Sequence, residues 1–106
     1  MAILGYPAVV LRHVVLLTWK PGTEVASIEA FAEGLAALPT RIPDIREYRF
    51  GADAGLADGN DDFAIVADFD NEDGYRQYAV HPAHRRLIAE LVAPILAGRH
   101  AVQYEV

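Results

Sequence analysis

The decapeptide YRQYAVHPAH, residues 75–84, decides how the second half of the chain folds, and it contains two of the four histidines and two of the five tyrosines. Pro82 interrupts it. The residue before a proline avoids the helical region, so we predict that a helix carrying Tyr78 ends near Val80 or His81. Proline suits the first turn of a helix, and a second helix is therefore expected to begin around Pro82.

The helix expected after the proline has an apolar stripe that points His84 toward the core. Its apolar residues recur at helical spacing; they are Leu87, Ile88, Leu91, Val92 and Ile95. Extending this stripe backward by steps of three and four reaches His84. Tyr75 and Tyr78, three residues apart, share one face of the preceding helix. The two helices thus form a corner at Pro82, and this corner is expected to direct a tyrosine hydroxyl and an imidazole into one interior space.

Size and composition indicate one globular domain. The chain has 106 residues, of which 53% are hydrophobic and 23% charged. Its net charge of −6 disfavours a nucleic acid or an anionic membrane as partner, and the absence of cysteine excludes a disulfide framework or a thiolate metal site. Residues 1–10 are expected to form a loose N-terminal leader without signal-peptide character, and residues 11–106 the domain. The default compartment is cytoplasmic.

The remaining elements complete a β-α-β-β-α-β order. We expect strands at 12–19, 45–50, 63–69 and 100–106, with an exposed loop at 52–61. The first helix should start from Thr23 as N-cap and end at Pro39, and Asn71 should cap the second. Pro94 should kink or end the last helical segment, and Gly98 should close it. This order predicts an α+β, ferredoxin-like protomer with a four-stranded antiparallel sheet and helices on one face.

The first strand is apolar on both faces. Alternation places His13, Val15, Leu17 and Trp19 on one face, and Arg12, Val14, Leu16 and Thr18 on the other. A sheet with water on one side should alternate more cleanly, so the second face is expected to be covered as well. An apolar face exposed on a single chain usually marks an interface. We therefore predict a homodimer that packs sheet against sheet.

Residues 12–105 resemble the stress-responsive dimeric α/β barrel (Dabb) family. The matching segments are RHVVL at 12–16, KPGT at 20–23, Ile42-Pro43, and YAVHPAH at 78–84, which follows DFD at 68–70. The resemblance implies a ferredoxin-like protomer and a dimer whose two sheets close into a dimeric α/β barrel.

The resemblance also implies a chemistry. One plant branch of the family comprises polyketide cyclases that use a tyrosine and a histidine of this element, which correspond to Tyr78 and His84. Two further polar residues of that branch, a histidine and a tyrosine, are replaced here by Phe63 and Leu35. In such a site His84 would act as a general base and Tyr78 would donate to the oxygen that gains charge.

A ligand pocket is expected between helices and sheet. His13 should form its floor, and the apolar walls should come from Leu17, Leu35, Phe63, Leu87 and Leu91. The expected ligand is a small hydrophobic carbonyl or phenolic compound, and the expected enzyme a cofactor-free cyclase or lyase. The alternative is a stress-responsive dimeric module that binds a small ligand without catalysis. A cofactor-free monooxygenase, known from another dimeric α/β barrel family, is a third class, and the HPxH element argues against it.

We expect neither a metal nor a cofactor. His81 and His84 are three residues apart, but Pro82 separates them, so His81 is expected to cap or pack the corner. Gly51, Gly55 and Gly59 lie in a loop that does not open a helix and therefore do not form a phosphate-binding loop.

Overall fold

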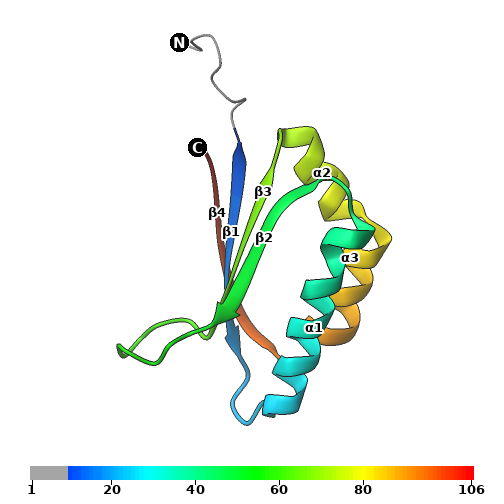
Figure 1. Ribbon diagram of the computed structural model, residues 1–106. Coiled ribbons are helices and arrows are strands. Elements are labelled where there is room, and N and C mark those ends of the chain that lie inside the picture. Colours follow the sequence, from blue (N-terminus) through cyan, green and yellow to red (C-terminus); the bar gives the residue numbers. More distant parts are fainter. Residues whose placement is uncertain (1–9) are drawn as a thin grey trace.

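The computed structural model describes residues 10–106 (Figure 1). The leader expected at residues 1–10 falls almost entirely on residues 1–9, which lie outside the described residues. The elements are β1 (Leu11–Trp19), α1 (Val25–Arg41), β2 (Ile45–Ala52), β3 (Phe63–Phe69), α2 (Glu72–Val80), α3 (Pro82–Leu87), the π-helical turn η1 (Ile88–Val92) and β4 (Leu96–Glu105). No helix in the described part of the chain is long and apolar enough to cross a membrane.

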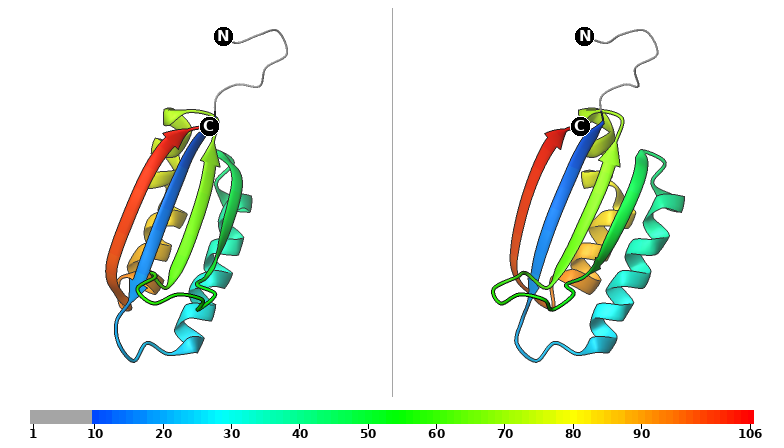
Figure 2. Two further views of the ribbon diagram at one scale, coloured as in Figure 1. Left: turned by 90° about the vertical axis from the view of Figure 1, so that its left-hand side faces the viewer. Right: turned by 60° about the vertical axis from the view of Figure 1, so that its left-hand side comes forward.

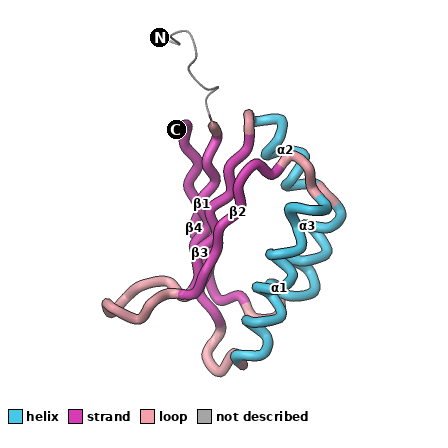
Figure 3. The backbone as a smooth tube through the Cα atoms, in the orientation of Figure 1, coloured by secondary structure: helices cyan, strands magenta, loops and turns pink. Residues whose placement is uncertain are grey.

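The four strands form one antiparallel sheet in the order β2-β3-β1-β4 (Figure 2). All helices lie on one side of this sheet, and the other side carries none (Figure 3). This arrangement confirms the predicted ferredoxin-like fold. We call the uncovered side the outer face; on β1 it carries Arg12, Val14, Leu16 and Thr18.

The core lies between the sheet and the helices. The helix-facing residues of β1 are buried, with exposed fractions between 3% and 9%; they are His13, Val15, Leu17 and Trp19. They face Phe31, Leu35 and Leu38, the buried residues of α1. The alternate side chains of β1 and the apolar face of α1 thus pack together in one layer.

The ends of α1 differ from the prediction. Glu24, not Thr23, occupies the N-cap position, and the Thr23 hydroxyl instead donates to the Lys20 carbonyl at 2.6 Å. The helix also continues through Pro39 to Arg41. Proline removes one backbone donor, but the extra turn buries Ile42 completely and closes with an Ile42 N–H bond to Leu38. Burial of this apolar side chain offsets the cost of the proline.

The last strand begins earlier than predicted. β4 starts at Leu96 rather than His100, and Gly98 lies inside the strand opposite Thr18 instead of closing the helix. The register of β1 and β4 shifts at Thr18/Trp19, and glycine is common at such irregularities. The helical segment does end near Pro94, as predicted, because η1 finishes at Val92. β2 likewise continues past Gly51 to Ala52.

Candidate functional site

Pro82 separates two helices, as predicted. α2 ends at Val80, His81 is extended (φ −62°, ψ 134°), and α3 begins at Pro82. His81 caps α3, because its Nδ1 accepts the Ala83 N–H at 3.0 Å. At the other end of α2, the Asn71 side chain accepts the Gly74 N–H at 3.0 Å, so the predicted Asn71 cap is also present.

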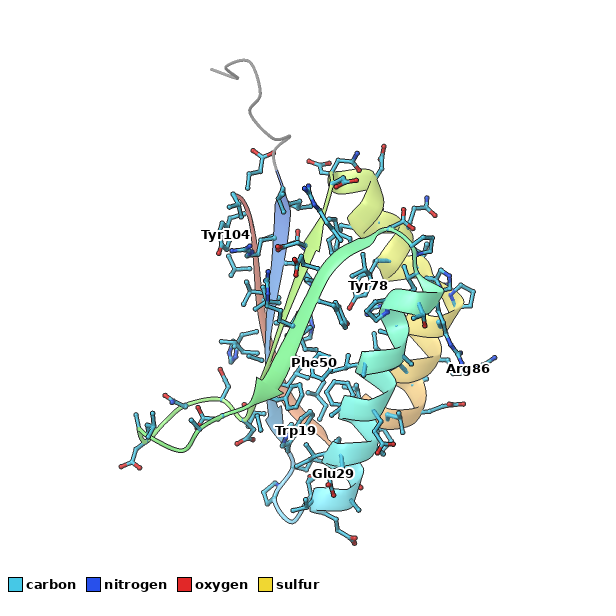
Figure 4. The ribbon with its side chains drawn as sticks, in the orientation of Figure 1. Trp19, Glu29, Phe50, Tyr78, Arg86 and Tyr104 are labelled. Atoms are coloured by element: carbon cyan, nitrogen blue, oxygen red, sulfur yellow. The ribbon has the colours of Figure 1, made fainter. Side chains whose placement is uncertain are left out.

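A cavity of about 130 Å³ lies between the sheet and the helices. Six of the residues predicted from sequence line it: His13, Leu17, Leu35, Tyr78, His84 and Leu87. Figure 4 shows Tyr78 in the layer between the helices and the sheet. Tyr75 and Arg99 also border the cavity.

Two predicted wall residues lie outside the cavity lining. The ring of Phe63 stacks on Phe50 and contacts Trp19 and Phe31, so it belongs to an aromatic core cluster. Leu91 borders a separate groove between α1 and α3. Periodicity placed both side chains on the buried layer but could not distinguish cavity wall from solid core.

Tyr78 and His84 are direct neighbours across the corner. Their ring centroids are 4.1 Å apart and the planes are tilted by 39°. Tyr78 is 4% exposed, and its hydroxyl is 2.8 Å from the hydroxyl of Tyr48. Burial raises the pKa of Tyr78 to about 12 and raises the pKa of Tyr48 as well. Both phenols therefore keep their protons at neutral pH.

The hydrogen bond of His84 determines which ring nitrogen is free. Its Nδ1 lies 3.3 Å from the Ala79 carbonyl. A carbonyl only accepts, so Nδ1 donates and Nε2 of the neutral ring keeps its lone pair. Burial lowers the pKa of His84, which favours this neutral form at pH 7. His84 thus has the protonation state of a general base.

His13 has the opposite tautomer. Its Nδ1 accepts from the Gln103 side-chain amide at 3.0 Å, so the proton of the neutral ring is on Nε2. The ring centroids of His13 and Tyr75 are 5.0 Å apart. Burial, and then the nearby charge of Arg99, lowers the pKa of His13 to about 4. The cavity therefore offers one imidazole as an acceptor and another as a donor.

Sequence reasoning missed three polar residues of the site. Tyr48, on β2, bonds to Tyr78; Gln103, on β4, bonds to His13; and Arg99, also on β4, borders the cavity. Each comes from a strand outside the 75–84 segment, so only the pairing of the strands in the sheet places these residues at the site. Among residues 10–106, no group of three or more histidine, aspartate or glutamate side chains is placed to hold a metal ion.

The fold and the cavity define a ferredoxin-like α+β domain with a small, mostly apolar site beside its helical corner. Residues 11–106 match the model of Dabb, the stress responsive A/B barrel domain, and the chain belongs to this family. The resemblance seen in the sequence is thereby confirmed.

Several relatives share this fold. A dimeric ferredoxin-like protein of unknown function from Thermobifida fusca is 44% identical, with a TM-score of 0.86 over 98% of this chain and 97% of that one. The stress-response A/B barrel domain-containing protein HS1 of Arabidopsis thaliana is 25% identical over 70% of both chains. A hydroxynitrile lyase from Passiflora edulis is 17% identical, with a TM-score of 0.82 over 94% of this chain and 95% of that one, and shares the fold.

Proposed function

We propose that the cavity binds a small carbonyl or phenolic compound and that His84 and Tyr78 perform cofactor-free acid–base chemistry on it. One observation carries the proposal: a neutral imidazole with a free Nε2 lies 4.1 Å, centroid to centroid, from a buried phenol ring at the wall of a cavity. General acid–base catalysis needs such a pair within reach of one ligand.

The proposed roles follow from the hydrogen bonds. His84 Nε2 removes a proton from a carbon next to a carbonyl, or from a hydroxyl. The Tyr78 hydroxyl donates to the oxygen on which negative charge develops. When Tyr48 donates to the Tyr78 oxygen, the Tyr78 proton is free to face the ligand. Tyr48 is therefore proposed as a positioning residue for Tyr78.

The cavity limits the size of the ligand. Pockets for drug-sized ligands are roughly 300–1,000 Å³, whereas this cavity is about 130 Å³. An engineered apolar cavity of about 150 Å³ accommodates benzene. The ligand body is therefore proposed to be a single small ring or a short chain, which is smaller than the polyketide-like substrates suggested by the family resemblance.

Exchange of carbon-bound protons with solvent tests the proposed acid–base chemistry without knowledge of the product. Small ketones such as cyclopentanone are incubated with the protein in D₂O, and loss of the α-proton signal is followed by NMR. The His84→Gln change is expected to slow this exchange about 10²–10⁴-fold, and Tyr78→Phe about 10²–10³-fold. His100→Gln is the control, because the His100 side chain is 74% exposed.

A non-catalytic binding module is the second candidate. The hydrogen bond between Tyr78 and Tyr48 favours it, because that bond satisfies one polar group of Tyr78 without any ligand. In this case the wild-type protein binds small ketones but exchanges no protons, and neither variant differs from it in rate. Catalysed exchange that survives His84→Gln would contradict the proposed role of His84.

We also propose that two copies associate through their outer faces. Val14 pairs with Val66 on one side and Val102 on the other, which makes a row of valines across this face. Leu16 is 37% exposed and Val102 57%. The relatives from Thermobifida fusca and from Bacteroides fragilis, the latter 28% identical with a TM-score of 0.82 over 92% of this chain and 96% of that one, are described as dimeric.

A further inference from the structure

Arg99 lies on the cavity side of the sheet. In the pairing of β1 with β4, Arg99 is opposite Leu17, and residues opposite each other in an antiparallel pair share a face. Leu17 is 3% exposed and points toward the helices. Arg99 therefore faces the helices too, and it borders the cavity together with His13, Tyr78 and His84. Its side chain remains exposed, so the guanidinium lies at the cavity rim.

The charge of Arg99 has no counter-ion in the described part of the chain. Arg12, Arg46, Arg49 and Arg76 each form an ion pair with a carboxylate. Within residues 10–106, Arg99 forms no such pair, and neither do Arg41, Arg85 and Arg86, but of these four only Arg99 borders the cavity. The cavity lining contains no aspartate or glutamate, although the chain has 15 acidic residues against 9 basic ones. An acidic protein thus has a cationic and otherwise apolar or neutral site.

Two acidic residues lie near Arg99 in the sheet but outside the cavity lining: Asp61 Oδ2 is 3.8 Å from Nδ1 of His100, and Asp62 accepts the Trp19 N–H. A larger group of acidic residues lies at the far end of β1. An open depression there is bordered by Asp70, Glu72, Asp73 and Glu105, and it contains neither Tyr78 nor His84. Glu105 pairs with Leu11, six residues before Leu17, so these acids are roughly 20 Å from Arg99 along the strand. This distance exceeds the screening length of about 8–10 Å at ordinary ionic strength.

The two histidines add no positive charge at neutral pH. Burial and the charge of Arg99 both lower the pKa of His13 and of His84, so each ring is neutral there. Arg99 is therefore the one fixed charge of the cavity lining, and its field reaches both imidazoles and Tyr78.

We propose that the ligand is a small monoanionic carboxylate whose charged group binds Arg99 and whose apolar body fills the cavity. A guanidinium matches a carboxylate with two parallel hydrogen bonds. The single charge of Arg99 compensates a monoanion, whereas a phosphate dianion would bring a second, uncompensated charge to an apolar cavity. Leu35 and Leu87 would contact the body of the ligand, and Tyr78 and His84 its reactive carbon or oxygen.

This inference rests on the proposed function, because it names the ligand class of the same cavity. It makes Arg99 a specificity-determining residue. Its role does not depend on the base, so His84→Gln should keep the preference for a carboxylate while losing proton exchange. The two proposals can therefore fail separately.

Matched neutral and anionic probes test the inference. Benzoate is compared with benzamide, and butyrate with butyramide in case the aromatic ring is too large, with Kd measured by titration. The wild-type protein should prefer the carboxylate of at least one pair by about tenfold or more, and high salt should reduce this preference. Arg99→Met keeps much of the apolar stem but removes the charge, so it should weaken carboxylate binding far more than amide binding and thereby abolish the preference.

Arg41→Met is the matched control. Arg41 lies in the last turn of α1, carries the same charge and is absent from the lining of the cavity. It should keep the preference for the carboxylate. Equal affinity of the wild-type protein for both members of each pair, or a preference that survives Arg99→Met, would overturn the inference about charge. A wild-type protein that binds none of the four probes would overturn both this inference and the proposed ligand site.

Discussion

The His13 imidazole is neutral in the folded protein at pH values where an unfolded histidine is protonated. Its pKa is lowered from 6.5 to about 4. Unfolding therefore takes up a proton between these two values, so the free energy of unfolding falls as the pH drops from 6.5 to about 4 and gains nothing from this group above 6.5. The expected loss is on the order of 3 kcal/mol. The lowered pKa of His84 acts in the same direction.

Denaturant unfolding at several pH values measures this effect. His13→Gln should flatten the dependence between pH 6.5 and 4 by nearly one proton. An unchanged slope in His13→Gln would show that this imidazole titrates as it does in the unfolded chain.

The hydrogen bond between Tyr48 and Tyr78 couples β2 to the corner. Tyr78→Phe removes one hydroxyl and leaves that of the half-buried Tyr48 without its partner, which should cost about 1–2 kcal/mol of unfolding free energy. Tyr48→Phe together with Tyr78→Phe should cost less than the sum of the single changes, with a coupling energy of about 1 kcal/mol. Strict additivity would mean that the 2.8 Å contact contributes nothing to stability.

Among the helices, α1 and α3 approach each other at Gly34. A Cβ added there would overlap the Leu87 side chain and lie 3.2 Å from Leu91 Cδ1. Alanine improves helix propensity by about 1 kcal/mol, but overpacking costs about 1–3 kcal/mol. Gly34→Ala should therefore lower the thermal midpoint. It should also weaken ligand binding, because Leu87 lines the cavity.

Gly51→Ala is the control for this prediction. A Cβ at Gly51 has no atom within 4 Å, and Gly51 lies in a strand without a positive φ. Calorimetry should show little change for this variant. A Gly34→Ala protein as stable as the wild type would mean that the Leu87 side chain can shift at no cost.

Elements governed by local rules could be predicted from the sequence. Pro82 separates the helices and Asn71 caps α2, because both effects act within three residues. The end of α1 could not be predicted, since the burial of Ile42 overrides the proline signal. The site residues likewise include some that the local sequence predicts and some that it does not. Tyr78 and His84 are neighbours in sequence, whereas Tyr48, Gln103 and Arg99 reach it only through the strand register.

For the whole molecule, the proposed association of outer faces predicts that a charge introduced on the outer face separates the two copies. Leu16→Glu would place an unpaired charge in an apolar interface, which is costly. It should shift the mass measured by sedimentation at micromolar concentration from two chains to one. Val25→Glu is the control, because Val25 is 70% exposed at the start of α1 on the helix side of the sheet. A wild-type protein that sediments as one chain would contradict the proposed dimer.

The location of the cavity on the helix side has a consequence for how two associated copies would respond to ligand. The cavity lies between the helices and the sheet, so the sheet separates it from the outer face. Filling one cavity is therefore expected to leave the proposed surface between the copies unchanged. Saturation should then follow a hyperbola with a Hill coefficient of about 1, so occupancy would rise gradually with ligand concentration rather than at a threshold.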